Sequence, residues 1–206
     1  MSMYPGRVTG LFVLIAAGIS AGCATQPPRN PHDLCQVFSE KRAWYKAARK
    51  SQQRWQTPIA LQMAIIYQES RFKATARPPR KRFLGFIPTT RKSSAFGYAQ
   101  ATDSTWRWYQ QQTGRRGADR DDFGDAVDFV GWYASMSRQK LGLSWNDARH
   151  HYLAYHEGHT GYLRRSYRRK PRLQRIADEV ARRTKQYHHQ LRHCRKRLER
   201  PWWWPG

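Results

Sequence analysis

Acidic residues are scarce in this chain. Its 206 residues include 14 Asp and Glu against 38 Lys and Arg, which gives a formal net charge of +24. Only five of the acids are glutamates: Glu40, Glu69, Glu157, Glu179 and Glu199. So large an excess of positive charge indicates anionic partners, a class that includes nucleic acids. The charge alone does not choose among them.

Alternation of polar and apolar residues is missing over any useful length, and no segment is repeated. Both absences argue against a sheet-rich or repeat fold, and the apolar residues recur at helical spacing, so the sequence predicts an all-α fold. Thr57, Asp103 and Ser144 are expected to cap helices. The segment 77–92 interrupts the pattern and is predicted to form a basic loop or short hairpin. We expect helices over 35–53, 57–71, from 103, 125–141, 144–158 and 171–198, the last long and basic.

Cysteine is rare, with three residues in the chain. Cys23 follows one basic residue, an apolar stretch over 11–19 and three small residues. This order is typical of a signal peptide over 1–22, and its apolar stretch is too short to span a membrane. The small residues before the cysteine resemble a bacterial lipobox, which implies that Cys23 is lipidated; Ala24 behind it implies transfer to the outer membrane. The alternative is an ordinary secretory signal that leaves Cys23 as a spare thiol.

Export changes what the charge implies, because an exported protein does not normally meet nucleic acid. We therefore expect no nucleic-acid partner. In the bacterial envelope the anionic partners are lipid headgroups, lipopolysaccharide phosphates and the carboxylates of peptidoglycan stems, and salt would weaken the attraction to any of them. We expect the protein on the periplasmic side of that envelope.

The remaining cysteines, Cys35 and Cys194, lie near the two ends of the mature chain. In an oxidising compartment they would form a disulfide, and the alternative is two unpaired buried thiols. We expect residues 23–34 to be the lipid-anchored cysteine with a polar tether, and 35–200 to form one helical domain. The tryptophan-rich tail, 201–206, would pack on the domain or lie at a membrane interface.

One glutamate stands in apolar sequence. From Ile59 to Tyr67 the only polar side chain is Gln62, so most of this predicted helix must be buried. Glu69 follows two isoleucines at helical spacing and shares their face. Burial disfavours the charged form of a carboxyl group and keeps its proton to higher pH, as a general acid for glycosidic cleavage requires. The alternative is a helix-terminal glutamate that faces solvent or pairs with Arg71.

Three short motifs follow in order: Glu69–Phe72, then Ser93–Thr102 with Trp106 behind it, then Ala154–Tyr162. Together they resemble the SLT-domain lytic transglycosylases, which show an E-S motif, a G-L-M-Q-like segment and an A-Y-N-x-G-like segment. The resemblance covers about Thr57 to Tyr162. It implies the goose-type lysozyme-like helical fold and a peptidoglycan glycan strand as substrate.

The resemblance also implies site residues, with Glu69 as catalytic acid and base. Gly97 would let the backbone approach the glycan, Gln100 would hydrogen-bond it, and the hydroxyl of Tyr155 would reach the carboxylate or the sugar. Ala99 and His156 replace the family's Met and Asn, which puts the contacts there in doubt. The substrate-binding residues implied are Ser70, Gly97, Tyr98, Gln100, Tyr155 and His156.

The implied reaction suits a chain with few glutamates. Most glycosidases need two carboxyl groups, whereas lytic transglycosylases use one and close a 1,6-anhydro ring with the sugar's own 6-hydroxyl. No metal or cofactor is expected, because the histidines fit no compact zinc motif. Aromatic residues such as Trp106, Trp108 and Tyr162 would stack on sugar rings or pack in the core.

Two alternatives remain open at this point. A muramidase of the same fold would use water as nucleophile and would need a second group, for which Glu157 or Asp103 is available. A non-catalytic lipoprotein would bind glycan or anionic envelope polymers through its basic surface.

Overall fold

The computed structural model describes residues 26–79, the backbone of 82–83 and 87–88, and residues 93–200. The predicted signal peptide, Cys23, most of the basic loop and the tryptophan-rich tail lie outside the described residues.

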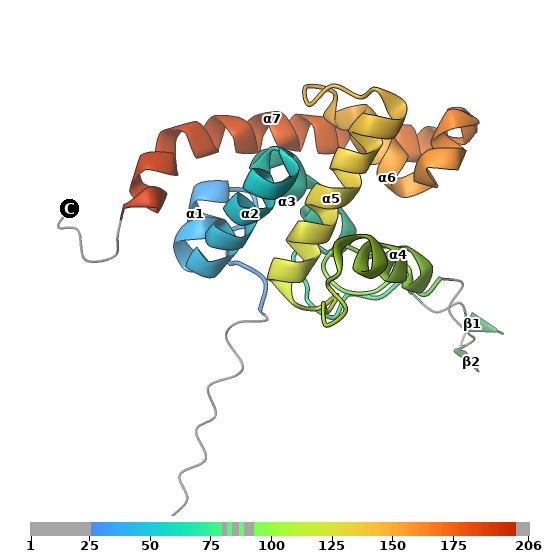
Figure 1. Ribbon diagram of the computed structural model, residues 1–206, viewed down its shortest axis with the longest axis horizontal. Coiled ribbons are helices and arrows are strands. Elements are labelled where there is room, and N and C mark those ends of the chain that lie inside the picture. The colour runs from blue at the N-terminus through green and yellow to red at the C-terminus, as the bar shows by residue number, and fades with distance from the viewer. Residues whose placement is uncertain (1–25, 80–81, 84–86, 89–92, 201–206) are drawn as a thin grey trace, which may run out of the picture.

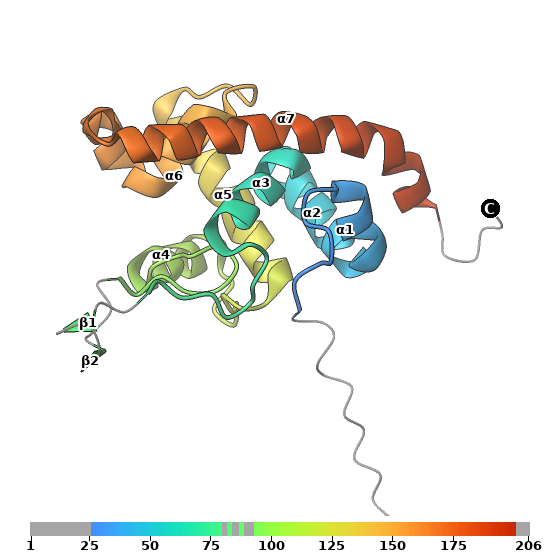
Figure 2. The same cartoon turned by 180° about the vertical axis from the view of Figure 1, so that it is seen from behind.

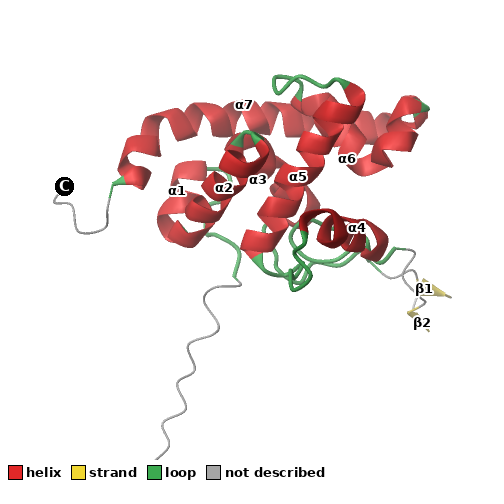
Figure 3. Cartoon of the chain, viewed as in Figure 1, coloured by secondary structure: helices red, strands yellow, loops and turns green. Residues whose placement is uncertain are grey.

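The fold is all-α, as the sequence predicts, and its only strands among the described residues form a two-stranded antiparallel hairpin (Figure 3). The helices are α1 (Leu34–Glu40), α2 (Arg42–Trp55), α3 (Ile59–Ser70), α4 (Asp103–Thr113), α5 (Phe123–Leu141), α6 (Ala148–Leu163), the 3-10 helix η1 (Ser166–Arg169) and α7 (Pro171–Glu199). The strands are β1 (Arg82–Phe83) and β2 (Ile87–Pro88), with Phe83 opposite Ile87.

The longest helix, α7, runs along one side of the molecule (Figure 1). It packs against α1 at one end, α3 in the middle and α6 at the other end, while α5 lies between α2 and α6. Seen from behind, α4 and the β1–β2 hairpin lie on the side away from α7 (Figure 2). No helix among the described residues is long and apolar enough to cross a membrane.

Helix α3 is the central helix of the core, as its sequence predicts. All residues from Ile59 to Tyr67 are buried, including Gln62, whose side-chain nitrogen donates to the carbonyl of Thr57 at 2.7 Å. The expectation that Thr57 caps this helix is wrong. Its hydroxyl donates instead to the carbonyl of Gly131 in α5 at 2.7 Å, and Pro58 occupies the N-cap position.

Other helix boundaries also differ from the predictions, since α5 begins at Phe123 and α6 continues past Gly158 to Leu163. The predicted helix over 35–53 is two helices, because Lys41 leaves the helical region (φ −117°, ψ 67°) between α1 and α2. The N-cap of α4 is Thr102, whose hydroxyl accepts from the backbone of Thr105, and that of α6 is Asp147. In α4 and α6 a polar side chain near the predicted cap accepts the first-turn N–H group.

Helix α7 buries one apolar stripe and exposes its basic face. Leu173, Ala177 and Val180 begin the stripe, which continues to Leu198 at helical spacing. Cys194 on this stripe forms a disulfide with Cys35 of α1. The two Cα atoms are 5.9 Å apart, and the residues are separated by 159 positions in the sequence. The two ends of the described domain are therefore covalently joined.

Candidate active site

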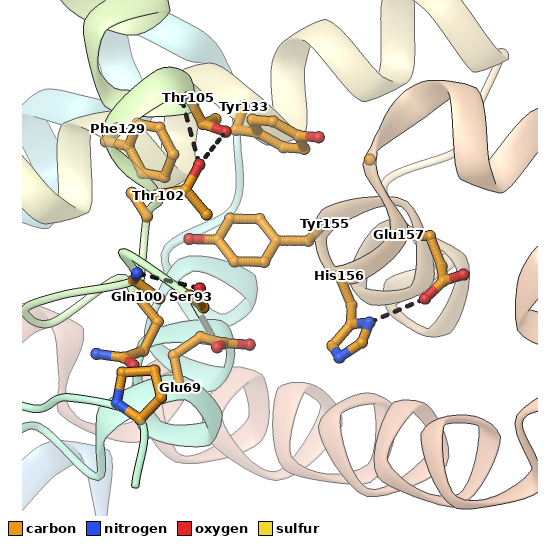
Figure 4. Close-up of a pocket in the computed structure, with 14 residues that line it drawn as sticks. Glu69, Ser93, Gln100, Thr102, Thr105, Phe129, Tyr133, Tyr155, His156 and Glu157 are labelled. Atoms are coloured by element: carbon orange, nitrogen blue, oxygen red, sulfur yellow. Dashed lines mark hydrogen bonds and ion pairs between the residues drawn. The ribbon is translucent and has the colours of Figure 1, made fainter. Parts of the chain in front are cut away.

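A cavity of about 470 Å³ lies where α3, α4, α5 and α6 meet the loop before α4. Glu69 enters it from the end of α3, and Gln100 enters from the loop (Figure 4). Phe129 and Tyr133 of α5 form an apolar wall. The lining is completed by Pro78, Ser93, Ala95, Ala101, Thr102, Thr105, Tyr155, His156, Glu157 and Gly158.

Glu69 has the most perturbed carboxyl group of the cavity. Its Oε1 atom is buried without a hydrogen-bond partner in the described part of the chain, while the residue as a whole is part-exposed toward the cavity. Burial raises the pKa of Glu69 from 4.5 to about 7, although a hydrogen bond from Tyr152 acts in the opposite direction. A carboxyl group with such a pKa holds or releases a proton near neutral pH.

Tyr155 connects the third motif to the second. Its hydroxyl donates to the backbone carbonyl of Ala99 at 2.6 Å, and its ring meets that of Tyr133 edge-on at 5.2 Å. Burial and the charge of Glu69 hold the pKa of Tyr155 well above its usual value of 10. Tyr155 is therefore a neutral hydroxyl group in the wall of the cavity.

Gln100 lines the cavity in a strained backbone conformation (φ +49°). Its side-chain nitrogen donates to the carbonyls of Ala76 and Gly97, both at 2.8 Å. These two bonds fix the carboxamide, so the group that Gln100 can offer to a ligand is its side-chain oxygen.

Gly97 packs against the backbone of Arg120. It has a positive φ (+79°), and a Cβ atom there would lie 2.0 Å from the carbonyl oxygen of Arg120. The next residue donates its backbone N–H to that same oxygen at 3.1 Å. The absent side chain thus allows the loop to pack on Arg120, and Gly97 is not among the residues that line the cavity.

Tyr98 and Ser70 also lie outside the cavity lining. Tyr98 is 1 % exposed and packs edge-on against Trp44 and Phe123, so its position does not support a contact with a glycan. The hydroxyl of Ser70 is buried and donates to the carbonyl of Ile66 at 3.1 Å. Both residues support the site from the core rather than line it.

His156 and Glu157 lie side by side at the α6 end of the cavity. His156 Nδ1 is 3.0 Å from Glu157 Oε1, and Lys170 Nζ is 2.8 Å from the same oxygen. Burial alone would raise the pKa of Glu157, but hydrogen bonds from Lys170, Ser166 and His156 outweigh it, so the pKa lies below its usual value. Glu157 is therefore a fixed anion, in contrast to Glu69.

The aromatic residues singled out in the sequence do not line the cavity. Trp106 is buried and donates its ring N–H to the carbonyl of Ala118 at 3.2 Å, while Trp108 packs on Trp132 and Tyr162 stacks on Tyr167. The sequence did not indicate that Phe129 and Tyr133 line the cavity, because they lie in an apolar stretch that is typical of a buried core. Within the described residues, no group of three or more His, Cys, Asp or Glu side chains is placed to hold a metal ion.

Comparison with protein families gives one match, to the family described as transglycosylase SLT domain, over residues 11–194. Comparisons with curated proteins and with solved structures gave no match. The family match confirms the resemblance that the three motifs indicated. Because it covers most of the chain, the protein belongs to the transglycosylase SLT domain family, and its function is peptidoglycan-related and transglycosylase- or lysozyme-like.

Proposed function

We propose that this protein is a peptidoglycan lytic transglycosylase that cleaves the β-1,4 bond between N-acetylmuramic acid and N-acetylglucosamine without water. The observation that carries the proposal is the state of Glu69. It is a carboxyl group at the base of a cavity, and burial raises its pKa to about 7. Such a group can give a proton to the bridging oxygen and take one back within a single reaction cycle.

The proposed reaction uses Glu69 twice. In the first step its proton passes to the glycosidic oxygen, the bond to the anomeric carbon breaks, and the muramic acid N-acetyl group stabilises the developing positive charge. In the second step the ionised Glu69 takes the proton of the 6-hydroxyl, whose oxygen bonds to the anomeric carbon. The products are a free N-acetylglucosamine hydroxyl and a 1,6-anhydro muramic acid end, and Glu69 regains its proton.

The other carboxylates considered for a two-acid mechanism are both engaged in ion pairs. Glu157 pairs with Lys170 at 2.8 Å, and Asp103 pairs with Arg120 at 2.8 Å. Both oxygens of Glu157 accept hydrogen bonds, and Asp103 is not among the residues that line the cavity, so neither offers a free carboxylate oxygen to a water beside the sugar. The ion pairs therefore favour the mechanism with Glu69 alone over the hydrolytic muramidase mechanism.

Three further residues are proposed to bind the glycan in the cavity. Tyr155 lies beside the reacting carboxylate, Gln100 offers its side-chain oxygen, and His156 offers a ring nitrogen. Each is a neutral or titratable hydrogen-bonding group, which suits a neutral sugar better than a charged one. We propose no metal or cofactor for the reaction.

The proposal places the enzyme in the bacterial envelope, where Cys23 anchors it by a lipid to the periplasmic side of the outer membrane. The exposed face of α7 carries Arg175, Arg182, Lys185 and Lys196. This basic face would hold the domain near anionic envelope polymers, with an affinity that falls as salt rises.

Digestion of purified peptidoglycan sacculi tests the reaction type. The lytic transglycosylase predicts 1,6-anhydro muropeptides by mass spectrometry and no incorporation of ¹⁸O from labelled water. Reducing ends that carry ¹⁸O would instead identify a muramidase. Sacculi that bind the protein but release no soluble product would identify the non-catalytic binder.

A further inference from the structure

A polar network closes the α6 end of the cavity, and the proton transfers proposed above do not use it. The carboxylate of Glu157 lies at its centre, with its side chain 3 % exposed. Its Oε1 accepts from His156 Nδ1 at 3.0 Å and from Lys170 at 2.8 Å, and its Oε2 accepts from Ser166 and from Lys170 at 2.9 Å. Both oxygens are therefore occupied by donors.

The network joins three segments of the chain. Gly158 interrupts α6 directly after Glu157 (φ +71°, ψ 161°), and the chain then returns through η1, which carries Ser166. Lys170 precedes the first residue of α7. Ser166 Oγ also lies 3.0 Å from the carbonyl oxygen of Gly161, so its single proton is shared between that carbonyl and the carboxylate, and the hydroxyl contacts both parts of the turn. Glu157 is held firmly enough to orient a neighbour.

That neighbour is His156, which lies on the cavity side of Glu157 (Figure 4). A carboxylate that accepts from Nδ1–H favours the imidazole tautomer in which Nε2 carries the lone pair. The His156 side chain is 47 % exposed, so a ligand in the cavity can reach the ring. A neutral Nε2 accepts hydrogen bonds from hydroxyl or amide N–H groups.

We propose that Glu157 is a positioning residue that acts through His156, fixing the ring so that Nε2 accepts a hydrogen bond from a hydroxyl or N-acetyl N–H group of the bound glycan. The identity of the ligand rests on the proposed function. The inference is otherwise separate from the proton transfers assigned to Glu69.

A double-mutant cycle tests the inference, because coupled residues give non-additive effects. The binding of soluble, uncross-linked peptidoglycan strands is measured by calorimetry in a Glu69→Gln background, where no strand is cleaved. Glu157→Gln and His156→Ala are each expected to raise the Kd about three- to tenfold, the value of one hydrogen bond. The variant that carries both changes should bind no more weakly than His156→Ala alone.

Two results of the cycle would overturn the inference. If the Kd of the double variant rises by the product of the two single-variant changes, Glu157 does not act through His156. If the Kd is unchanged in both single variants, neither residue contributes to binding. If wild type releases product from sacculi in these cases, the proposed function stands and only this inference fails. Strands that bind to none of the proteins, with no product from wild type, would overturn both.

Folding of the variant is not expected to limit the test. Glu157→Gln keeps the shape of the side chain, and the Lys170 side chain is 51 % exposed, so its charge remains hydrated. An independent measurement is made on the unaltered network. It records the imidazole ¹⁵N resonances of the full chain and assigns them by comparison with His156→Ala. The inference predicts a protonated Nδ1 and an unprotonated Nε2 on His156, and the opposite tautomer would contradict it.

Discussion

The hydroxyl of Tyr155 donates a hydrogen bond to the backbone carbonyl of Ala99 at 2.6 Å. These residues are 56 positions apart in the sequence, in the third and second motifs of the family pattern. The bond fixes the loop that carries Gln100 relative to α6, and both segments line the cavity with Glu69. The site therefore depends on a contact between a side chain and the backbone of a distant loop.

Tyr155→Phe should lower the rate of peptidoglycan cleavage about 10- to 100-fold, because a small displacement of the loop misplaces the substrate. The change also leaves the Ala99 carbonyl without this donor and should cost about 1–2 kcal/mol of stability. Tyr162→Phe is the matched control, since it removes a hydroxyl that bonds His150 at 2.6 Å outside the cavity lining. Equal activity losses in the two variants would contradict the assigned importance of Tyr155.

The raised pKa of Glu69 predicts a specific dependence of stability on pH. The folded protein holds this proton to about pH 7, whereas the unfolded chain releases it near pH 4.5. Stability from this group is thus present below pH 4.5 and is lost as pH rises toward 7. Because glutamine does not titrate, the Glu69→Gln variant should not lose this stability as pH rises. Above pH 7 its free energy of unfolding should exceed that of wild type by about 1–3 kcal/mol.

Chemical unfolding of both proteins at several pH values measures this difference. Glu157→Gln provides a contrast of opposite sign, because the lowered pKa of Glu157 means that its charged form stabilises the fold at neutral pH. That variant should be less stable than wild type at pH 7. A stability difference between Glu69→Gln and wild type that does not change with pH would show that Glu69 titrates normally.

Gly97→Ala should disturb the loop that carries Gln100. The added methyl group would lie 2.0 Å from the carbonyl oxygen of Arg120, in a backbone conformation (φ +79°) that alanine disfavours. We expect a loss of about 2–5 kcal/mol in unfolding free energy, from strain and overpacking together. Gly114→Ala is the control that measures backbone strain without a steric clash, since Gly114 has φ +71° with open space around it. It should lower the unfolding free energy by about 1–2 kcal/mol. Similar losses in the two variants would mean that the close approach to Arg120 is unimportant.

The disulfide between Cys35 and Cys194 should contribute strongly to stability. On the chain-entropy model, closing a loop of this length stabilises the folded state by about 5 kcal/mol. Denaturant unfolding with and without reductant measures the contribution, and Cys35→Ala with Cys194→Ala gives the same comparison without reductant. Identical unfolding curves would show that the bridge is absent in solution or has no effect.

The features predicted correctly from the sequence depend on local patterns. The stripe of α7 and the apolar run of α3 are periodic over many residues, and periodicity is a property of the sequence itself. The position of Glu69 follows from the same run, because helical spacing places it on the face of its apolar neighbours.

The features that sequence reasoning missed depend on distant partners. The hydroxyl of Thr57 bonds Gly131 rather than its own helix, and the motif pattern does not distinguish a core residue such as Tyr98 from a residue that lines the cavity. Glu157 looked like a second acid because its partners, Ser166 and Lys170, are 9 and 13 residues away beyond a turn. Only the folded chain shows that these donors occupy its oxygens.

The central claim is that one carboxyl group, Glu69, carries the chemistry. The direct measurement is the rate at which wild type, Glu69→Gln and Glu179→Gln release soluble muropeptides from sacculi. Glu179 is an exposed glutamate on α7 and serves as the isosteric control. We predict a loss of at least about 1,000-fold in Glu69→Gln, as expected for an essential acid–base group, and no change in Glu179→Gln. Retention of activity in a folded Glu69→Gln protein would contradict the account.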